Sequence, residues 1–116
     1  MTHQIKKYND LVRNGMLPTR KHEDFEIRNN VLVRYRGNSQ KIIIPKNVVL
    51  IAPRVFMGFT KITSLYIYDN VILDICTDAF KGCTSLYDIH IPKKYCNEEK
   101  LKQIGFNDKQ ITLILK

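Results

Sequence analysis

The side chains that could carry out catalysis or bind a metal are scattered along the chain. His3, His22 and His90 are far apart, and none lies at metal-ligand spacing from cysteines or carboxylates. The acidic pairs Glu23-Asp24 and Glu98-Glu99 consist of adjacent residues, whose side chains diverge on a helix and are poorly placed for general acid–base chemistry. The sequence contains no nucleotide-binding glycine loop and no nucleophile-elbow motif. We therefore predict no catalytic residues, no metal site and no cofactor.

The three cysteines also give little indication of chemistry. Cys76 and Cys83 are too far apart to resemble the paired ligands of a zinc knuckle. Cys83 falls at a repeated apolar position, described below, so we expect it to be a buried free thiol. Cys76 and Cys96 could be exposed, but no neighbouring base indicates that either thiol is activated. An odd number of cysteines fits a reducing compartment.

The composition describes an ordinary globular protein. The chain has 116 residues, of which 44% are apolar and 26% charged, and this length corresponds to one domain. No apolar run approaches the roughly 20 residues of a membrane span. The first residues lead into no apolar stretch of the signal-peptide kind. These features predict a cytoplasmic protein without a membrane partner.

Positive charge is concentrated in one part of the sequence. The formal net charge is +8, and six bases face one acid between residues 25 and 60. A basic surface attracts nucleic acid, acidic proteins or anionic membranes. A solvated surface that merely keeps the protein soluble would carry the same pattern. The many isoleucines, lysines and asparagines are typical of an AT-rich genome, which would itself raise the lysine content.

A repeat of about two dozen residues organises most of the chain. Short alternating apolar pairs recur at this interval: Ile42-x-Ile44, Leu65-x-Ile67, Ile89-x-Ile91 and Leu113-x-Leu115. Segments 55–62 and 79–86 also share the order small or branched apolar, Phe, Gly, Thr, aliphatic. This period predicts the stacked coils of a solenoid. Each coil would add a short strand to a ladder and a phenylalanine to the far side.

These residues resemble the BspA-type leucine-rich repeat, whose pattern is I-x-I-P followed by V, I, an A-F pair, a G-C pair and L. The first copy matches at Ile42, Ile44, Pro45, Val48, Ile51, Val55-Phe56, Gly58 and Ile62, and the second at Leu65, Ile67, Val71, Ile75, Ala79-Phe80, Gly82-Cys83 and Leu86. The resemblance covers residues 42–92 well and 93–115 loosely, with Phe59 in place of Cys and Tyr68 in place of Pro. It implies about three coils, interaction surfaces that are often on bacterial cell surfaces, and no catalytic residues.

The N-terminal part of the chain is expected to cap the solenoid. The spacing of Ile5, Tyr8 and Val12 predicts an amphipathic helix over Gln4–Arg13, which would close the open front or, alternatively, dock a partner. The strands expected at residues 25–28 and 31–35 alternate apolar and polar side chains. Asn29-Asn30 between them suits a two-residue hairpin turn.

The C-terminal part is expected to form a second cap. Asn97 is placed to cap a helix that carries Glu98 and Glu99 in its first turn and ends at Gly105. Residues 111–115 would supply a last strand. The predicted fold class is therefore α/β, a short β-rich leucine-rich-repeat solenoid with an N-terminal helix and hairpin cap and a C-terminal helix–strand cap. It forms a single domain over 1–116, divided into a cap at 1–41, repeats at 42–96 and a cap at 97–116.

Strand alternation predicts a row of side chains on the outer side of the ladder. If Ile42, Ile44 and their counterparts face the core, the outward residues are Lys41, Ile43, Ser64, Tyr66, Tyr68, Asp88 and His90, with Ile114 beyond them. Tyrosine suits the centre of a binding surface because it offers both apolar area and a polar tip. The alternative is that these side chains pack against one another across coils. Arg34 and Arg36 would extend the row with positive charge.

The predicted function is a non-catalytic protein-binding module that uses Lys41, Ile43, Tyr66, Tyr68, Asp88, His90, Arg34 and Arg36. Its partner would be another protein, either acidic or associated with nucleic acid. The alternative is a small inhibitor or regulator of a host nucleic-acid-handling enzyme, of the kind that phages and mobile elements encode. Direct nucleic-acid binding is a third class, which rests on the local charge alone. An unpaired last strand would also permit homodimers through an end of the solenoid.

Overall fold

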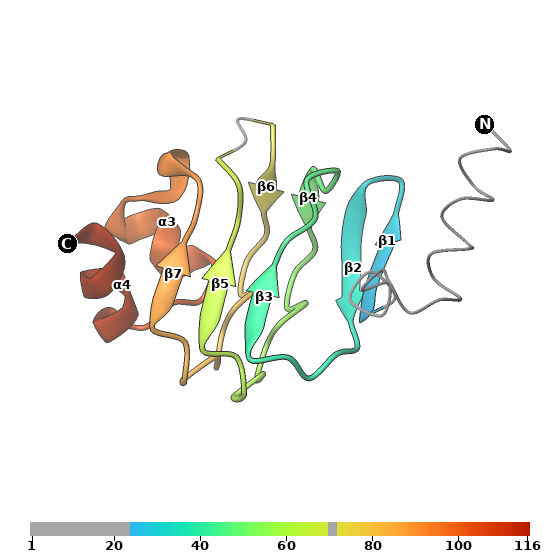
Figure 1. Cartoon of the computed structure of the whole chain (residues 1–116). Coiled ribbons are helices and arrows are strands. Elements are labelled where there is room, and N and C mark those ends of the chain that lie inside the picture. The colour runs from blue at the N-terminus through green and yellow to red at the C-terminus, as the bar shows by residue number, and fades with distance from the viewer. Residues whose placement is uncertain (1–23, 70–71) are drawn as a thin grey trace, which may run out of the picture.

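The computed structural model describes residues 24–69 and 72–116, in which the chain winds through two sheets and ends in helices (Figure 1). The expected helix over Gln4–Arg13 and the repeat residue Val71 lie outside the described residues. In the two described ranges, no helix has the length and apolar character that crossing a membrane requires.

Three short parallel strands form the first sheet: β3 (Lys41–Ile43), β5 (Ser64–Tyr66) and β7 (Asp88–His90). Ile42 lies opposite Leu65, and Leu65 lies opposite Ile89. Each rung therefore stands one sequence repeat from the next, which confirms the expected stacking of coils. The branched side chains at these positions suit a pleated, half-buried surface and meet across the rungs.

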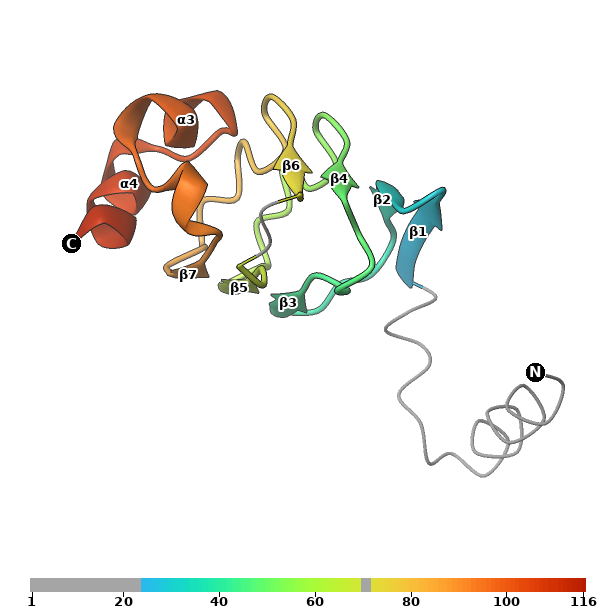
Figure 2. The ribbon, with the colours of Figure 1, turned by 90° about the horizontal axis from the view of Figure 1, so that it is seen from above.

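A second sheet contains four strands in the order β1-β2-β4-β6: β1 (Phe25–Arg28), β2 (Val31–Tyr35), β4 (Leu50–Ile51) and β6 (Asp74–Ile75). The strands β2, β4 and β6 are parallel, while β1 and β2 form the expected antiparallel hairpin. Asn29 and Asn30 adopt φ angles of 51° and 66°, as a two-residue hairpin turn requires. From above, the two sheets lie on opposite sides of the coiled chain (Figure 2).

The alternation expected through β2 is wrong, because the hairpin contains a bulge. The register shifts between Glu26 and Ile27, so that Val33 has no opposite residue on β1. Because of this extra residue, Val33 and Arg34 are both exposed, and Tyr35 points inward again. Leu32 and Tyr35 are consequently buried, whereas Val33 is exposed.

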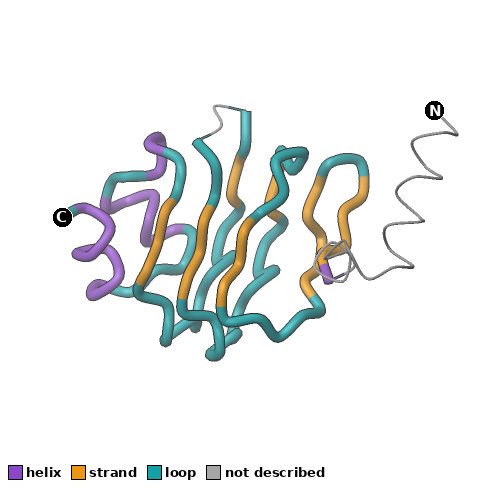
Figure 3. Tube along the Cα trace, in the orientation of Figure 1, coloured by secondary structure: helices purple, strands orange, loops and turns teal. Residues whose placement is uncertain are grey.

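The core lies between the two sheets and the turns that join them. Leu32, Ile51 and Leu65 have no exposed surface and come from both sheets. The turns contribute phenylalanines, and the rings of Phe56 and Phe80 stack with centroids 5.1 Å apart and planes only 3° apart. Figure 3 shows that long loops join these short strands. The coils are therefore held together mainly by the packing of the repeated side chains.

The chain leaves β7 through a short 3₁₀ helix, η1 (Lys93–Tyr95), and the helix α3 (Glu98–Gln103). Asn97 caps α3 as expected, since its side-chain oxygen accepts a hydrogen bond of 2.9 Å from the Lys100 N–H. Gly105 follows the helix with a φ angle of 106°, which allows the chain to turn back.

The strand expected at residues 111–115 is wrong, because helix α4 (Asp108–Leu115) occupies this segment. Asn107 and Gln110 form a capping box: each side chain accepts a hydrogen bond from the other's backbone N–H. The C-terminal cap is therefore a helix pair, not a helix and a strand. The unpaired last strand, on which the expected homodimer depended, does not exist.

Two polar side chains join these helical segments to the sheets. The amide nitrogen of Gln110 donates to the carbonyls of Cys83 and Leu86, at 2.7 and 3.0 Å, and so holds α4 against the turn before β7. The hydroxyl of Tyr95 accepts a 2.8 Å hydrogen bond from the Ile75 N–H, at the outer edge of β6. Tyr95 thus supplies the partner that a further strand would have offered.

Candidate interaction surface

Outward-facing side chains of the first sheet and its continuation form one surface, which we call the ladder face. The pleat of each strand sends alternate residues to opposite sides, so the neighbours of buried Ile42 and Leu65 point outward. The members of the ladder face are Lys41, Ile43, Ser64, Tyr66, Tyr68, Asp88 and His90. The structure therefore brings six of the predicted site residues together with Ser64. Ile114, which was expected beyond them, lies on α4 instead.

Tyr66 lies at the centre of an aromatic row within the ladder face. Its ring centroid is 5.1 Å from that of Tyr68, in an edge-on arrangement, and 5.5 Å from the imidazole of His90. Tyr66 is nevertheless 43% exposed and Tyr68 37% exposed. The rings thus pack across coils and still present area to solvent. Because packing already restricts their rotamers, a partner would immobilise them at a reduced entropic cost.

A carboxylate organises the polar end of the ladder face. Asp88 contacts the Nε2 of His90 at 3.0 Å through one oxygen and accepts a hydrogen bond of 3.2 Å from the Ser64 hydroxyl through the other. Since the carboxylate lies between hydroxyl and imidazole, His90 is not placed as the base that would activate Ser64. The arrangement orients His90 and Ser64 for recognition through hydrogen bonds.

Lys46 places a cation beside the ladder face, which the sequence reasoning missed. Its ammonium lies 4.7 Å from the ring centroid of Tyr68, within the range of a cation–π contact. The register of the repeat could have predicted the position of Lys46. Ile43 lies opposite Tyr66, so two residues further along Pro45 comes opposite Tyr68, and Lys46 follows directly.

The two predicted arginines do not join the ladder face. Arg34 belongs to β2 and Arg36 follows that strand, so both leave from the second sheet. The Arg36 guanidinium pairs with Glu26 at 2.6 Å, and the same carboxylate holds Arg28 at 2.7 Å. The paired guanidinium of Arg36 is therefore partly neutralised, while Arg34 is exposed on another sheet.

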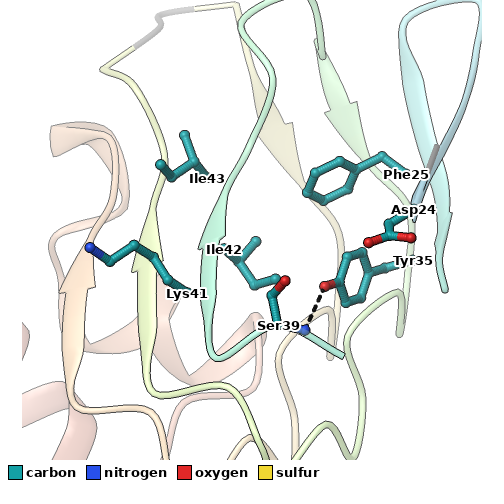
Figure 4. Close-up of a pocket in the computed structure, with 7 residues that line it drawn as sticks. All are labelled: Asp24, Phe25, Tyr35, Ser39, Lys41, Ile42 and Ile43. Carbon is teal, nitrogen blue, oxygen red and sulfur yellow. Dashed lines mark hydrogen bonds between the residues drawn. The ribbon is translucent and has the colours of Figure 1, made fainter. Parts of the chain in front are cut away.

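A groove and a small cavity flank β3 on the side of the β1–β2 hairpin. The groove has a volume of about 470 Å³ and is lined by Phe25, Ile43, Pro45, Lys46 and Tyr68, among others. The cavity, of about 60 Å³, is lined by residues of the hairpin and of β3 (Figure 4). Phe25 and Ile43 line both, so the two spaces share an apolar wall.

The thiols offer no reactive centre in the described part of the chain. Cys83 is the buried free thiol that was expected, and its Sγ donates to the Phe56 carbonyl at 3.0 Å. Burial raises the pKa of the Cys83 thiol to about 11. Burial, followed by the charge of Asp74, also raises the pKa of Cys76. Across residues 24–69 and 72–116, no three His, Cys, Asp or Glu side chains gather as metal ligands.

Comparisons with known proteins agree with this geometry. Residues 26–114 match the family model described as "BspA type Leucine rich repeat region (6 copies)". A search of curated proteins found no match. Among solved structures, a Treponema pallidum leucine-rich repeat protein is similar, with 23% sequence identity and a TM-score of 0.53. The likeness covers 60% of this chain and 37% of that protein, and at this identity it concerns the fold alone.

Proposed function

The chain belongs to the BspA-type leucine-rich repeat family, and on that premise we propose that it is a non-catalytic module that binds another protein through the ladder face. The single observation that carries the proposal is Tyr66, held between Tyr68 and His90 while nearly half of it stays exposed. Tyrosine is among the side chains enriched at the residues that contribute most binding energy in protein interfaces.

The chemistry around this aromatic row defines the partner that it would hold. Ile43 is 47% exposed and supplies aliphatic area at one end, while Asp88 and His90 supply hydrogen-bonding groups at the other. Lys41 and Lys46 add positive charge beside the row. A partner surface with an apolar centre and acidic residues toward β3 would complement this distribution.

The test is affinity capture with the full chain, followed by binding measurements on the captured protein. We expect Tyr66→Ala combined with Tyr68→Ala to weaken binding of that protein at least about tenfold, since buried tyrosines are typical hot spots. Tyr87→Ala is the matched control, because Tyr87 is 65% exposed outside the three strands of the sheet. Equal affinities for the double variant and the control would reject the ladder face as the binding surface.

The same material separates protein binding from direct nucleic-acid binding. Nucleic-acid binding through Arg34 and Arg36 would fall steeply with salt and would be lost in Arg34→Glu combined with Arg36→Glu. Capture through the ladder face should survive that double variant, because both arginines leave from the second sheet.

A further inference from the structure

The backbone of β3 presents an open edge on the side opposite β5. The Ile44 N–H donates to the Tyr66 carbonyl, and the Ser64 N–H donates to the Gln40 carbonyl. Even-numbered residues of this segment therefore direct their backbone groups to β5. Since these directions alternate along a strand, Lys41 and Ile43 direct their N–H and C=O groups the other way. In the described ranges, no strand pairs with β3 on that side.

The other sheet ends differ from β3 in what accompanies them. Beside β7, α4 is anchored through Gln110. At β6, the Tyr95 hydroxyl takes up the Ile75 N–H. The outermost strand β1 carries the ion pair between Glu26 and Arg28.

The groove and the cavity beside β3 form a channel along the open edge, with Asp24, Ser39 and Lys41 among the residues that line the cavity. Phe25 and Ile43 line both the groove of about 470 Å³ and the cavity of about 60 Å³ beside β3. In Figure 4, the Ile43 side chain lies on one side of this space, and Phe25, Asp24 and Tyr35 lie on the other. A strand that paired with Lys41 and Ile43 would direct alternate side chains toward this space, as strand-addition complexes do.

The charge near the edge indicates the chemistry of the occupant. Lys41 and Lys46 are exposed beside it. Two acids belong to the hairpin side: Glu26 is already paired with Arg28 and Arg36, and Asp24 lines the cavity. The chain's own residues 1–23 contain five bases and two acids, so their charge does not complement this region. An acidic segment would complement the charge of Lys41 and Lys46.

We propose that the open edge of β3 binds an extended acidic peptide segment of a partner by strand addition. The backbone groups of Lys41 and Ile43 would form the ladder hydrogen bonds, and aliphatic side chains of the peptide would enter the channel beside Phe25. Its acidic side chains would pair with Lys41 and Lys46. This recognition goes beyond the ladder face, because it adds main-chain hydrogen bonds at the β3 edge to the side-chain contacts of Lys41 and Lys46.

The first experiment is hydrogen exchange, followed residue by residue in the full chain at low ionic strength. In the free protein, we expect the amides of Lys41 and Ile43 to exchange fast, and those of Ile42 and Ile44 to exchange slowly. The probe is a capped hexapeptide that alternates glutamate and valine. It should slow exchange at Lys41 and Ile43 about tenfold or more, as pairing of these amides requires.

Matched probes and variants test the contribution of charge separately from that of backbone pairing. A hexapeptide with lysine in place of glutamate should bind about tenfold more weakly or worse, because like charges would meet. Lys41→Glu combined with Lys46→Glu should cause a similar loss for the acidic peptide. Lys109→Glu combined with Lys116→Glu is the control, since it changes the net charge equally at the other end of the solenoid.

Three results would overturn the proposal. Slow exchange at Lys41 and Ile43 in the free chain would mean that residues 1–23 or, if it depends on concentration, a second copy already covers the edge. Binding of the acidic peptide without protection of these amides would place it elsewhere. Equal binding of both hexapeptides would remove the role of charge. The readout is separate from capture by Tyr66 and Tyr68, so protected amides with failed capture would reject only the ladder face.

Discussion

The ring of Phe106 stacks on the ring of Phe80, with centroids 5.6 Å apart and planes 6° apart. This contact repeats the one between Phe56 and Phe80, although Phe106 lies between two helices. The backbone follows, because the Phe80 N–H donates to the Ile104 carbonyl as the Phe56 N–H donates to that of Ala79. The helical cap therefore provides a third rung for the phenylalanine stack.

Replacing Phe106 should destabilise the whole domain. Phe106 is only 4% exposed, so Phe106→Ala would leave a cavity under Phe80 and cost about 3–5 kcal/mol of unfolding free energy. Leu113→Ala, at a position that is 43% exposed on α4, should change it by less than about 0.5 kcal/mol. Urea unfolding followed by circular dichroism measures both. A small effect of Phe106→Ala would mean that the cap does not share the core.

The repeated part of the fold could be predicted because its period sets the register. With a spacing of about two dozen residues, Ile42, Leu65 and Ile89 must meet on neighbouring rungs, whatever the loops between them do. The C-terminal segment could be read in two ways. The alternation of Leu113 and Leu115 suggests a strand, but Ile111 and Ile114 also lie three residues apart on a helical face. The local capping box decided in favour of the helix.

The ladder face could be predicted from the same register, because strand alternation fixes which side chains point outward. Arg34 and Arg36 were misplaced for a physical reason: sequence proximity to β3 does not reveal that β2 pairs with β4 in the other sheet. The edge of β3 was also invisible, since an open edge depends on which strands are absent beside it. The pattern of side chains along β3 does not indicate whether another strand lies beside it.

Tyr95→Phe should loosen the outer edge of the second sheet. The substitution removes the hydroxyl that accepts from the Ile75 N–H but keeps the buried ring, so one backbone donor loses its partner. We expect a loss of about 1–3 kcal/mol in unfolding free energy and faster amide exchange at Ile75. Tyr87→Phe removes an exposed hydroxyl and should be neutral. An unchanged exchange rate at Ile75 would show that water replaces the hydroxyl without cost.

Gly105→Ala should be more costly than Gly58→Ala. Both glycines have positive φ angles, so either alanine would be strained, by about 1–2 kcal/mol near the left-handed helical region. The φ angle of Gly105, 106°, lies further from that region than the 79° of Gly58, so its alanine would be strained more. At Gly58, nothing lies within 4 Å of the added carbon. At Gly105, this carbon would approach the backbone N and Cα of Lys81 to 2.5 and 2.8 Å, so the two coils must separate.

The difference between these two alanine variants combines the close approach of Gly105 to Lys81 with the larger backbone strain at Gly105. We expect Gly105→Ala to be less stable than Gly58→Ala by about 1–3 kcal/mol, the usual range for forcing atoms into a packed region. Thermal and urea unfolding of both variants provide the comparison. Equal destabilisation would show that the cap shifts away from Lys81 freely and is not locked to the preceding coil.

The Cys83 thiol should make stability fall at alkaline pH. Burial raises its pKa from 9.0 to about 11, so the folded chain holds this proton where the unfolded chain releases it. The stabilisation is therefore complete below pH 9 and lost as pH rises toward 11, with a ceiling of about 2–3 kcal/mol. Cys83→Ala removes this dependence but leaves the other titrating groups in place. The stability advantage of the parent over Cys83→Ala should accordingly shrink between pH 9 and 11 in urea titrations. A constant difference across that range would mean that Cys83 ionises without penalty in the folded state, which its 2% exposure and its hydrogen bond to Phe56 argue against.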